Sequence, residues 1–187
     1  MTNLVLEPTS TAQWQSLVCE AEDNAKLQLD ETLESYLVFT LMRFSQRPEL
    51  TNSIIALEFL DGIQSQGQQQ HDQLRDVGDK CLLLSGLFPL MAKRRLLNLG
   101  YFVNMGRSAY QQLHDKIHGF YGQLATDFVP MMDVLQAIGE LNQQNHQFDL
   151  LDNFELWDET DSQLALQRIK TASNTGQPFK HDSETRH

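Results

Sequence analysis

The chain has 187 residues, 41% hydrophobic and 21% charged, which is enough for one globular domain with an apolar core. Fourteen basic against twenty-five acidic side chains give a formal net charge of −11. This charge argues against a nucleic-acid binder and against docking on anionic lipid, because an acidic surface repels phosphate groups.

The first two predicted elements are helices, since apolar residues recur at helical spacing and no sustained alternation typical of strands occurs. One helix is expected through residues 12–23. A second is expected through 31–44, "ETLESYLVFTLMRF", whose apolar residues cover most of its circumference. A helix of this kind is usually central to a bundle, so we expect Phe39 in the core.

Pro48 ends this second helix and precedes a third, at 49–63, which carries a wide apolar stripe. The following "QSQGQQQHDQ" is polar, and is either a loop or the solvated start of a helix that continues through "LRDVGDKCLLLSGLF". Asp79 precedes the apolar run of that helix. If it is buried it needs a cationic partner, and Arg107 or a cation at 93–95 is the expected one.

In the second half, Pro89 starts a short helix that stops near Gly100, and a long helix is expected from about Tyr101 towards Leu124. Pro130 precedes another helical segment, and two more follow before residue 173. The sequence therefore predicts an all-α fold, a single compact bundle of six to eight helices. The domain is expected to span 1–172, and the polar stretch 173–187 is expected to be a disordered tail.

The compartment is predicted from what the chain lacks. Cys19 and Cys81 lie far apart in apolar surroundings, which favours buried free thiols in a reducing cytosol. The N-terminus has no basic and apolar pattern of a signal peptide, and the most apolar stretch is too short to span a bilayer. We expect a cytoplasmic protein.

Four stretches together carry a resemblance: "ESYLVFTLMRF", "GDKCLLLSGLFP", "YFVNMGRSAY" and "NFELWDETDSQLALQRI". They resemble a family of short, uncharacterised all-helical proteins from proteobacteria, over most of the chain up to about residue 170. The resemblance implies one compact domain in a bacterial cytosol. It implies no activity, cofactor or catalytic residue.

Arg107, His114 and His118 fall in one row on the flank of the apolar stripe of their helix. The string "HDKIH" is similar to the zincin pattern His-Glu-x-x-His, with Asp115 at the place of the general base. It is also similar to the His-Asp-x-x-His helix of a ubiquinone-biosynthesis protein, in which a glutamate follows at the position that is Pro130 here. The row is interpreted as a structural boundary that binds no metal; an anion site or a metal site is the alternative.

The run Lys93, Arg94 and Arg95 stands out in an acidic chain. It is either a patch that docks an anion or a set of cations placed favourably near a helix C-terminus. No phosphate-binding glycine loop and no nucleophile elbow is present, so no catalytic residue, metal or cofactor is expected.

The function expected from these observations is that of a non-catalytic interaction or regulatory protein, which docks a partner protein or another copy of itself. A helical domain that binds a small apolar or anionic ligand is the alternative. A metal-dependent enzyme that uses His114 and His118 is a third, and whether the protein is an enzyme is left open.

Overall fold

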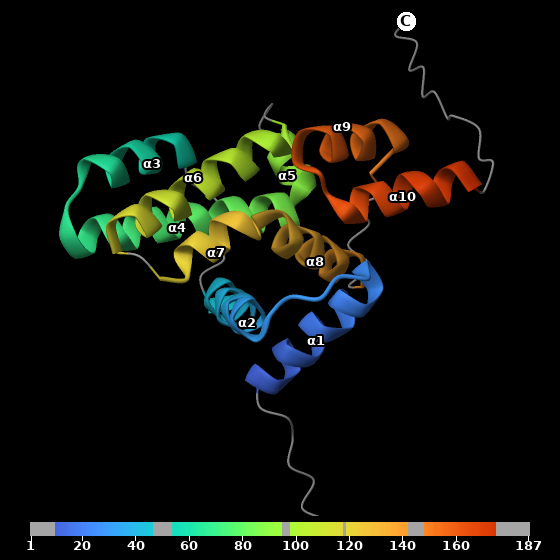
Figure 1. Ribbon diagram of the computed structural model, residues 1–187, viewed down its shortest axis with the longest axis horizontal. Coiled ribbons are helices and arrows are strands. Elements are labelled where there is room, and N and C mark those ends of the chain that lie inside the picture. The colour runs from blue at the N-terminus through green and yellow to red at the C-terminus, as the bar shows by residue number, and fades with distance from the viewer. Residues whose placement is uncertain (1–9, 47–53, 95–97, 118, 142–147, 175–187) are drawn as a thin grey trace, which may run out of the picture.

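The computed structural model describes residues 10–46, 54–94, 98–117, 119–141 and 148–174, which form ten helices and no strand (Figure 1). The helices are α1 (Ser10–Ala25), α2 (Glu31–Gln46), α3 (Ile55–Gln64), α4 (Gly67–Gly86), α5 (Pro89–Arg94), α6 (Leu99–Ile117), α7 (Tyr121–Thr126), α8 (Phe128–Leu141), α9 (Leu150–Thr160) and α10 (Gln163–Asn174). The all-α class is confirmed, but the predicted count of six to eight is too low.

The centre of the bundle is α4, with α6 lying along it and α3, α5 and α8 packed around it (Figure 1). Two glycines allow this close packing. A Cβ atom on Gly78 would lie 2.3 Å from the ring of Tyr110, and one on Gly106 would lie 2.4 Å from the ring of Phe128. Any side chain at these positions would force the helices apart, so the two glycines fix how closely α4, α6 and α8 approach.

The prediction that Phe39 belongs to the core is wrong, because its side chain is 63% exposed. Leu37, Val38 and Leu41 form the buried face of α2. This helix lies towards the lower edge of the molecule in Figure 1 and, among the described helices, packs chiefly against α1. An apolar circumference therefore does not make α2 the central helix.

The long helix expected from Tyr101 to Leu124 is two helices. α6 ends at Ile117, and Gly119, with a φ of +99°, lies in the turn before α7. The turn changes the direction of the chain, and Phe120 beside it is 38% exposed.

Several predicted boundaries agree with the structure. Pro89 is the first residue of α5, and Pro130 lies in the first turn of α8, where a missing backbone N–H breaks no helical hydrogen bond. The Gln-rich segment contains the start of α4. α10 continues to Asn174, while Pro48 and residues 175–187, where the tail was expected, lie outside the described residues. In the described part of the chain no helix is long and apolar enough to cross a membrane.

Candidate functional site

The outward face of α3 carries a row of large aliphatic side chains, which we call the α3 outer row: Ile54, Leu57, Leu60 and Ile63. Their side chains are 68%, 55%, 52% and 42% exposed, in that order. Successive members are three residues apart, so the row turns through about 180° around the helix and covers about half of its circumference. Four exposed aliphatic side chains on one helix form a surface typical of an interaction site.

The opposite face of α3 is fastened to α4, so the outer row cannot turn inwards. Ile55 is buried there, and Glu58 accepts a hydrogen bond of 2.6 Å from Lys80 Nζ. The Gln70 side chain, from α4, donates to the backbone carbonyls of Gly62 and Ile63 at 3.1 and 3.2 Å. The two hydrogen bonds from Gln70 lie at the last turn of α3, where backbone carbonyls have no partner within the helix.

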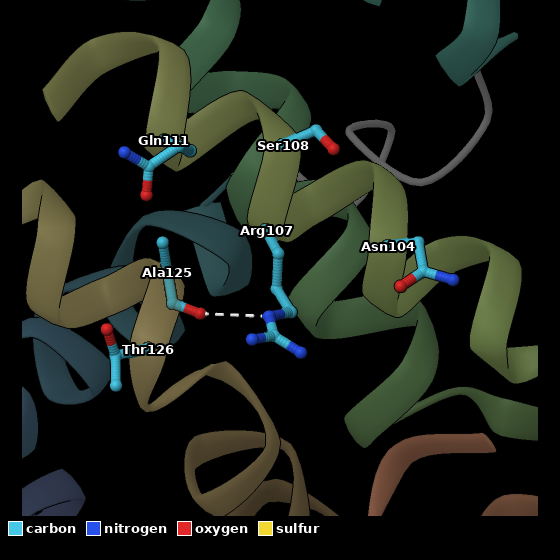
Figure 2. Close-up of a pocket in the computed structure, with 6 residues that line it drawn as sticks. All are labelled: Asn104, Arg107, Ser108, Gln111, Ala125 and Thr126. Carbon is cyan, nitrogen blue, oxygen red and sulfur yellow. Dashed lines mark hydrogen bonds between the residues drawn. The ribbon is translucent and has the colours of Figure 1, made fainter. Parts of the chain in front are cut away.

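A polar pocket lies between α6 and α7, and we call it the Arg107 pocket (Figure 2). It has a volume of about 480 Å³ and is lined by Asn104, Arg107, Ser108, Gln111, Ala125 and Thr126. The volume lies within the range of small-molecule sites, which is roughly 300–1,000 Å³. Among the lining residues only Arg107 carries a charge.

Arg107 reaches across the pocket from α6 to the end of α7. Its Nε donates a hydrogen bond of 3.1 Å to the backbone carbonyl of Ala125. That carbonyl belongs to the last turn of α7 and has no partner within the helix, so Arg107 caps α7. Figure 2 shows the two terminal amino groups of Arg107 beyond this hydrogen bond, on the far side of the guanidinium from the α6 backbone.

The other predicted site residues are only partly described. His114 is half-buried, as expected of the boundary row, and its ring lies against the backbone of Gly122 on α7, whereas Arg107, from the same row, is exposed. His118, Arg95 and the side chains of Lys93 and Arg94 lie outside the described residues. The structure therefore brings Arg107 and His114 onto the α7 side of α6 and leaves the predicted basic patch untested.

Asp79 is buried as expected, but its predicted partners are wrong. Its carboxylate accepts hydrogen bonds from the hydroxyls of Tyr36 and Tyr110, at 2.5 and 2.6 Å, and is paired with Arg43. Burial raises the pKa of Asp79, and the attraction of Arg43 and the two hydroxyl donors oppose this rise. Arg43 also contacts Asp76, at 3.1 Å. The group links α2 to the α4–α6 pair and is a structural tie.

Cys19, Glu22 and Glu34 lie together where α1 meets α2, with their sulfur and carboxylate atoms within 4.8 Å of one another. Glu22 is buried, and Cys19 is exposed, which corrects the prediction of a buried thiol. Glu22 Oε1 accepts a hydrogen bond of 2.6 Å from the backbone N–H of Leu29.

The surroundings of Glu22 disfavour its charged form. Burial, and then the neighbouring Glu34, raise the pKa of Glu22 to about 7. In the described part of the chain neither glutamate has an ion-pair partner. A proton on Glu22 would relieve the repulsion between the two carboxyl groups.

Sequence reasoning missed two parts of these sites. It predicted a wide apolar stripe on the helix at 49–63 without separating a buried side from an exposed side. The exposed side could have been inferred from the sequence, because aliphatic residues occur on opposite sides of α3. It also passed over Asn104 and Ser108, which lie within one turn of Arg107 on α6.

The chain matches no family model, no curated protein and no solved structure. Its resemblance to short helical proteobacterial proteins therefore stays a prediction, and a function has to be inferred from the residues and contacts of this chain.

Proposed function

We propose that this protein is a non-catalytic docking module, which binds a partner protein through the α3 outer row. The observation that carries the proposal is the exposure of Ile54, Leu57, Leu60 and Ile63 on a helix whose other face is already packed. Full burial of such a side chain is worth about 1.5–3 kcal/mol, so covering the exposed half contributes about 1 kcal/mol for each.

The charge of the chain indicates the chemistry of the partner. Asp61 is exposed on the same side of α3 as the outer row, and the whole chain carries a net charge of −11. Two copies of the chain would repel each other, whereas a partner with basic residues beside an apolar face would be attracted. The partner we propose is an amphipathic helix with lysine or arginine at its edges, which lies across α3 by its apolar face.

The test places a photo-crosslinking amino acid at position 60 and, in a second variant, at Lys170, an exposed position on α10. In cells we expect one protein adduct of defined mass from position 60 and none from position 170. The partner identified by mass spectrometry is then purified, and its affinity for the unmodified chain is measured by calorimetry.

The matched controls are Leu60→Glu and Leu151→Glu, since Leu151 is an equally apolar and exposed residue on α9. Leu60→Glu should weaken binding of the purified partner about tenfold or more, since it places a charge in the centre of an apolar contact. Leu151→Glu should leave the affinity within about twofold. An adduct between two copies of the chain, an adduct with lipid, or no adduct at position 60 would each contradict the proposal.

A further inference from the structure

Arg107 and Arg75 have no carboxylate partner among the described residues, whereas two other arginines do. Arg43 is paired with Asp76 and Asp79, and Arg168 with Glu140. In the described ranges no carboxylate is paired with Arg107, although acidic residues outnumber basic ones by 25 to 14. Arg107 is exposed at this pocket, so water hydrates its guanidinium, and an anion that binds there replaces that water with charge-assisted hydrogen bonds.

The contact with α7 determines which part of the guanidinium stays available. Nε is held by the carbonyl of Ala125 at 3.1 Å, so the side chain is fixed across the pocket. The two terminal amino groups form the remaining edge, and no described residue accepts a hydrogen bond from them. Two parallel N–H donors at this edge match the two oxygens of a carboxylate.

Further polar groups line the same pocket. Asn104 and Ser108 are exposed on α6 and make no side-chain hydrogen bond with any described residue, so an amide and a hydroxyl are available to a ligand. The Thr126 hydroxyl already donates to the carbonyl of Gly122, at 3.0 Å. The Gln111 amide donates to Asp115, at 2.8 Å, which leaves its oxygen as an acceptor.

We propose that the Arg107 pocket binds the carboxylate of a small organic anion, with Arg107 as the charged contact and Asn104 and Ser108 as neutral donors. A carboxylate is favoured over a phosphate ester because its two oxygens match the one planar guanidinium edge, whereas a phosphate ester presents three charged oxygens and only one cation lines the pocket. An apolar ligand is disfavoured by the polar lining. This site is separate from the α3 outer row and does not depend on the docking proposal.

The test is a nuclear magnetic resonance titration of the full chain that follows the side-chain Nε–H signal of Arg107. This signal is assigned by its absence from Arg107→Lys. The probe is succinate, compared with inorganic phosphate and chloride at matched ionic strength. We expect a saturable shift with succinate in the millimolar range, typical of a small ligand with few contacts, and a weak, non-saturating shift with the other two ions.

Variants separate binding from the structural role of Arg107 as a cap. In the variants binding is followed by the backbone amide signals of residues 104–108, because Arg107→Gln lacks the Nε–H signal. Arg107→Gln should weaken succinate binding about tenfold or more. The double variant Asn104→Ala/Ser108→Ala keeps the cap, so it should weaken binding several-fold while the melting temperature is unchanged. Lys170→Gln removes one positive charge on α10 and should leave binding within about twofold, and Leu60→Glu, in the docking row, should do the same.

Three results would overturn the proposal. The first is no saturable shift of the Arg107 signal with succinate, which would leave Arg107 as a helix cap only. The second is tighter binding of phosphate than of succinate. The third is equal weakening by Arg107→Gln and Lys170→Gln, which would show that net charge, and no defined site, governs the interaction.

Discussion

At the scale of single residues, Asp79 is a buried carboxylate that needs polar partners inside the fold. A carboxylate that is 2% exposed loses its hydration, and isolated charges in such places are strongly unfavourable. Here one guanidinium and two phenol hydroxyls replace the water, and the three donors come from α2 and α6. The position of α2 therefore depends on a polar contact as well as on its apolar face.

Replacing Asp79 with alanine should lower the free energy of unfolding by about 3–5 kcal/mol. The change leaves Arg43 without its buried partner and removes the acceptor of two buried hydroxyls, and breaking a buried pair from one side has a cost of this size. Urea denaturation followed by circular dichroism measures the loss.

The control is Asp76→Ala, because Asp76 contacts the same arginine but its side chain is 40% exposed. Exposed ion pairs contribute about 1 kcal/mol or less, so this variant should be nearly as stable as the wild type. A loss below about 1 kcal/mol for Asp79→Ala would mean that water satisfies the three donors, and that the contact is not a tie.

Glu22 makes a pH-dependent contribution to the stability of the fold. In the folded chain its pKa is raised to about 7 from an ordinary value of 4.5, so the folded state keeps a proton that the unfolded state releases. Between these two values acid stabilises the fold, and this contribution is lost as the pH rises through 7. The direction is opposite to that of an ordinary carboxylate in an ion pair.

Wild-type protein should therefore lose more stability than Glu22→Gln between about pH 5 and pH 8, by about 1–3 kcal/mol. Glutamine keeps the shape and an acceptor for the N–H of Leu29 but cannot ionise. Asp133, whose pKa burial raises to about 6, titrates in both proteins and cancels from the comparison. Urea denaturation at each pH, in buffer with a chelator, gives the free energy of unfolding of the two proteins as a function of pH. Equal slopes would show that Glu22 titrates normally.

At the scale of helices, α2 and α3 both show apolar residues that face outwards. The exposed Phe39 stands opposite the buried face of α2, whereas the exposed residues of α3 form a continuous row. Of these two helices, α3 offers the larger adjacent apolar surface, whereas a single exposed apolar side chain such as Phe39 is normal on soluble proteins.

Phe39→Ala should therefore change the free energy of unfolding by about 0.5 kcal/mol or less, as expected of a surface substitution. Leu37→Ala, in the same helix, removes a fully buried side chain and should cost about 2–5 kcal/mol through the cavity it leaves. Thermal and urea denaturation of the two variants test this contrast. A cost for Phe39→Ala as large as that for Leu37→Ala would contradict the exposed position.

Helical spacing was sufficient to predict the fold class and the need of Asp79 for a partner, but it could not identify Arg43 as that partner. Periodicity shows which side of a helix is apolar and contains no information on which helix that side meets. The positions of Gly78 and Gly106 did carry some of the missing information, because a glycine inside a helical pattern indicates close approach of a neighbour.

The Arg107 pocket was predictable only in part, for a related reason. Arg107 and its flank position follow from the angle of the residue on α6. The Ala125 carbonyl that fixes its side chain is accessible only because the chain turns at Gly119 and starts α7. In the expected continuous helix, residue 125 would lie about 27 Å along the axis from Arg107, out of reach of its side chain. The sequence therefore indicated Arg107 but could not predict the pocket.

At the scale of the whole molecule, charge is distributed unevenly. α9 and its caps contain six acidic residues and no basic one: Asp149, Asp152, Glu155, Asp158, Glu159 and Asp161. Asp149 and Asp152 form a capping box at the N-terminus, where negative charge is favourable, but Asp158, Glu159 and Asp161 lie near the C-terminal end, where it is not. Repulsion within this helix adds to that of the chain as a whole.

Added salt should therefore stabilise this protein. Raising sodium chloride from about 0.05 M to about 0.5 M shortens the distance over which exposed charges interact, and screens repulsion that the net charge of −11 makes dominant. We expect the melting temperature to rise by about 2–4 °C, which for a domain of this size corresponds to about 1 kcal/mol. Differential scanning calorimetry measures the shift.

The double variant Glu155→Lys/Asp158→Lys, at two exposed positions, should melt higher at low salt and gain less from added salt. A fall in melting temperature with salt would mean that ion pairs such as Lys80–Glu58 outweigh the repulsion.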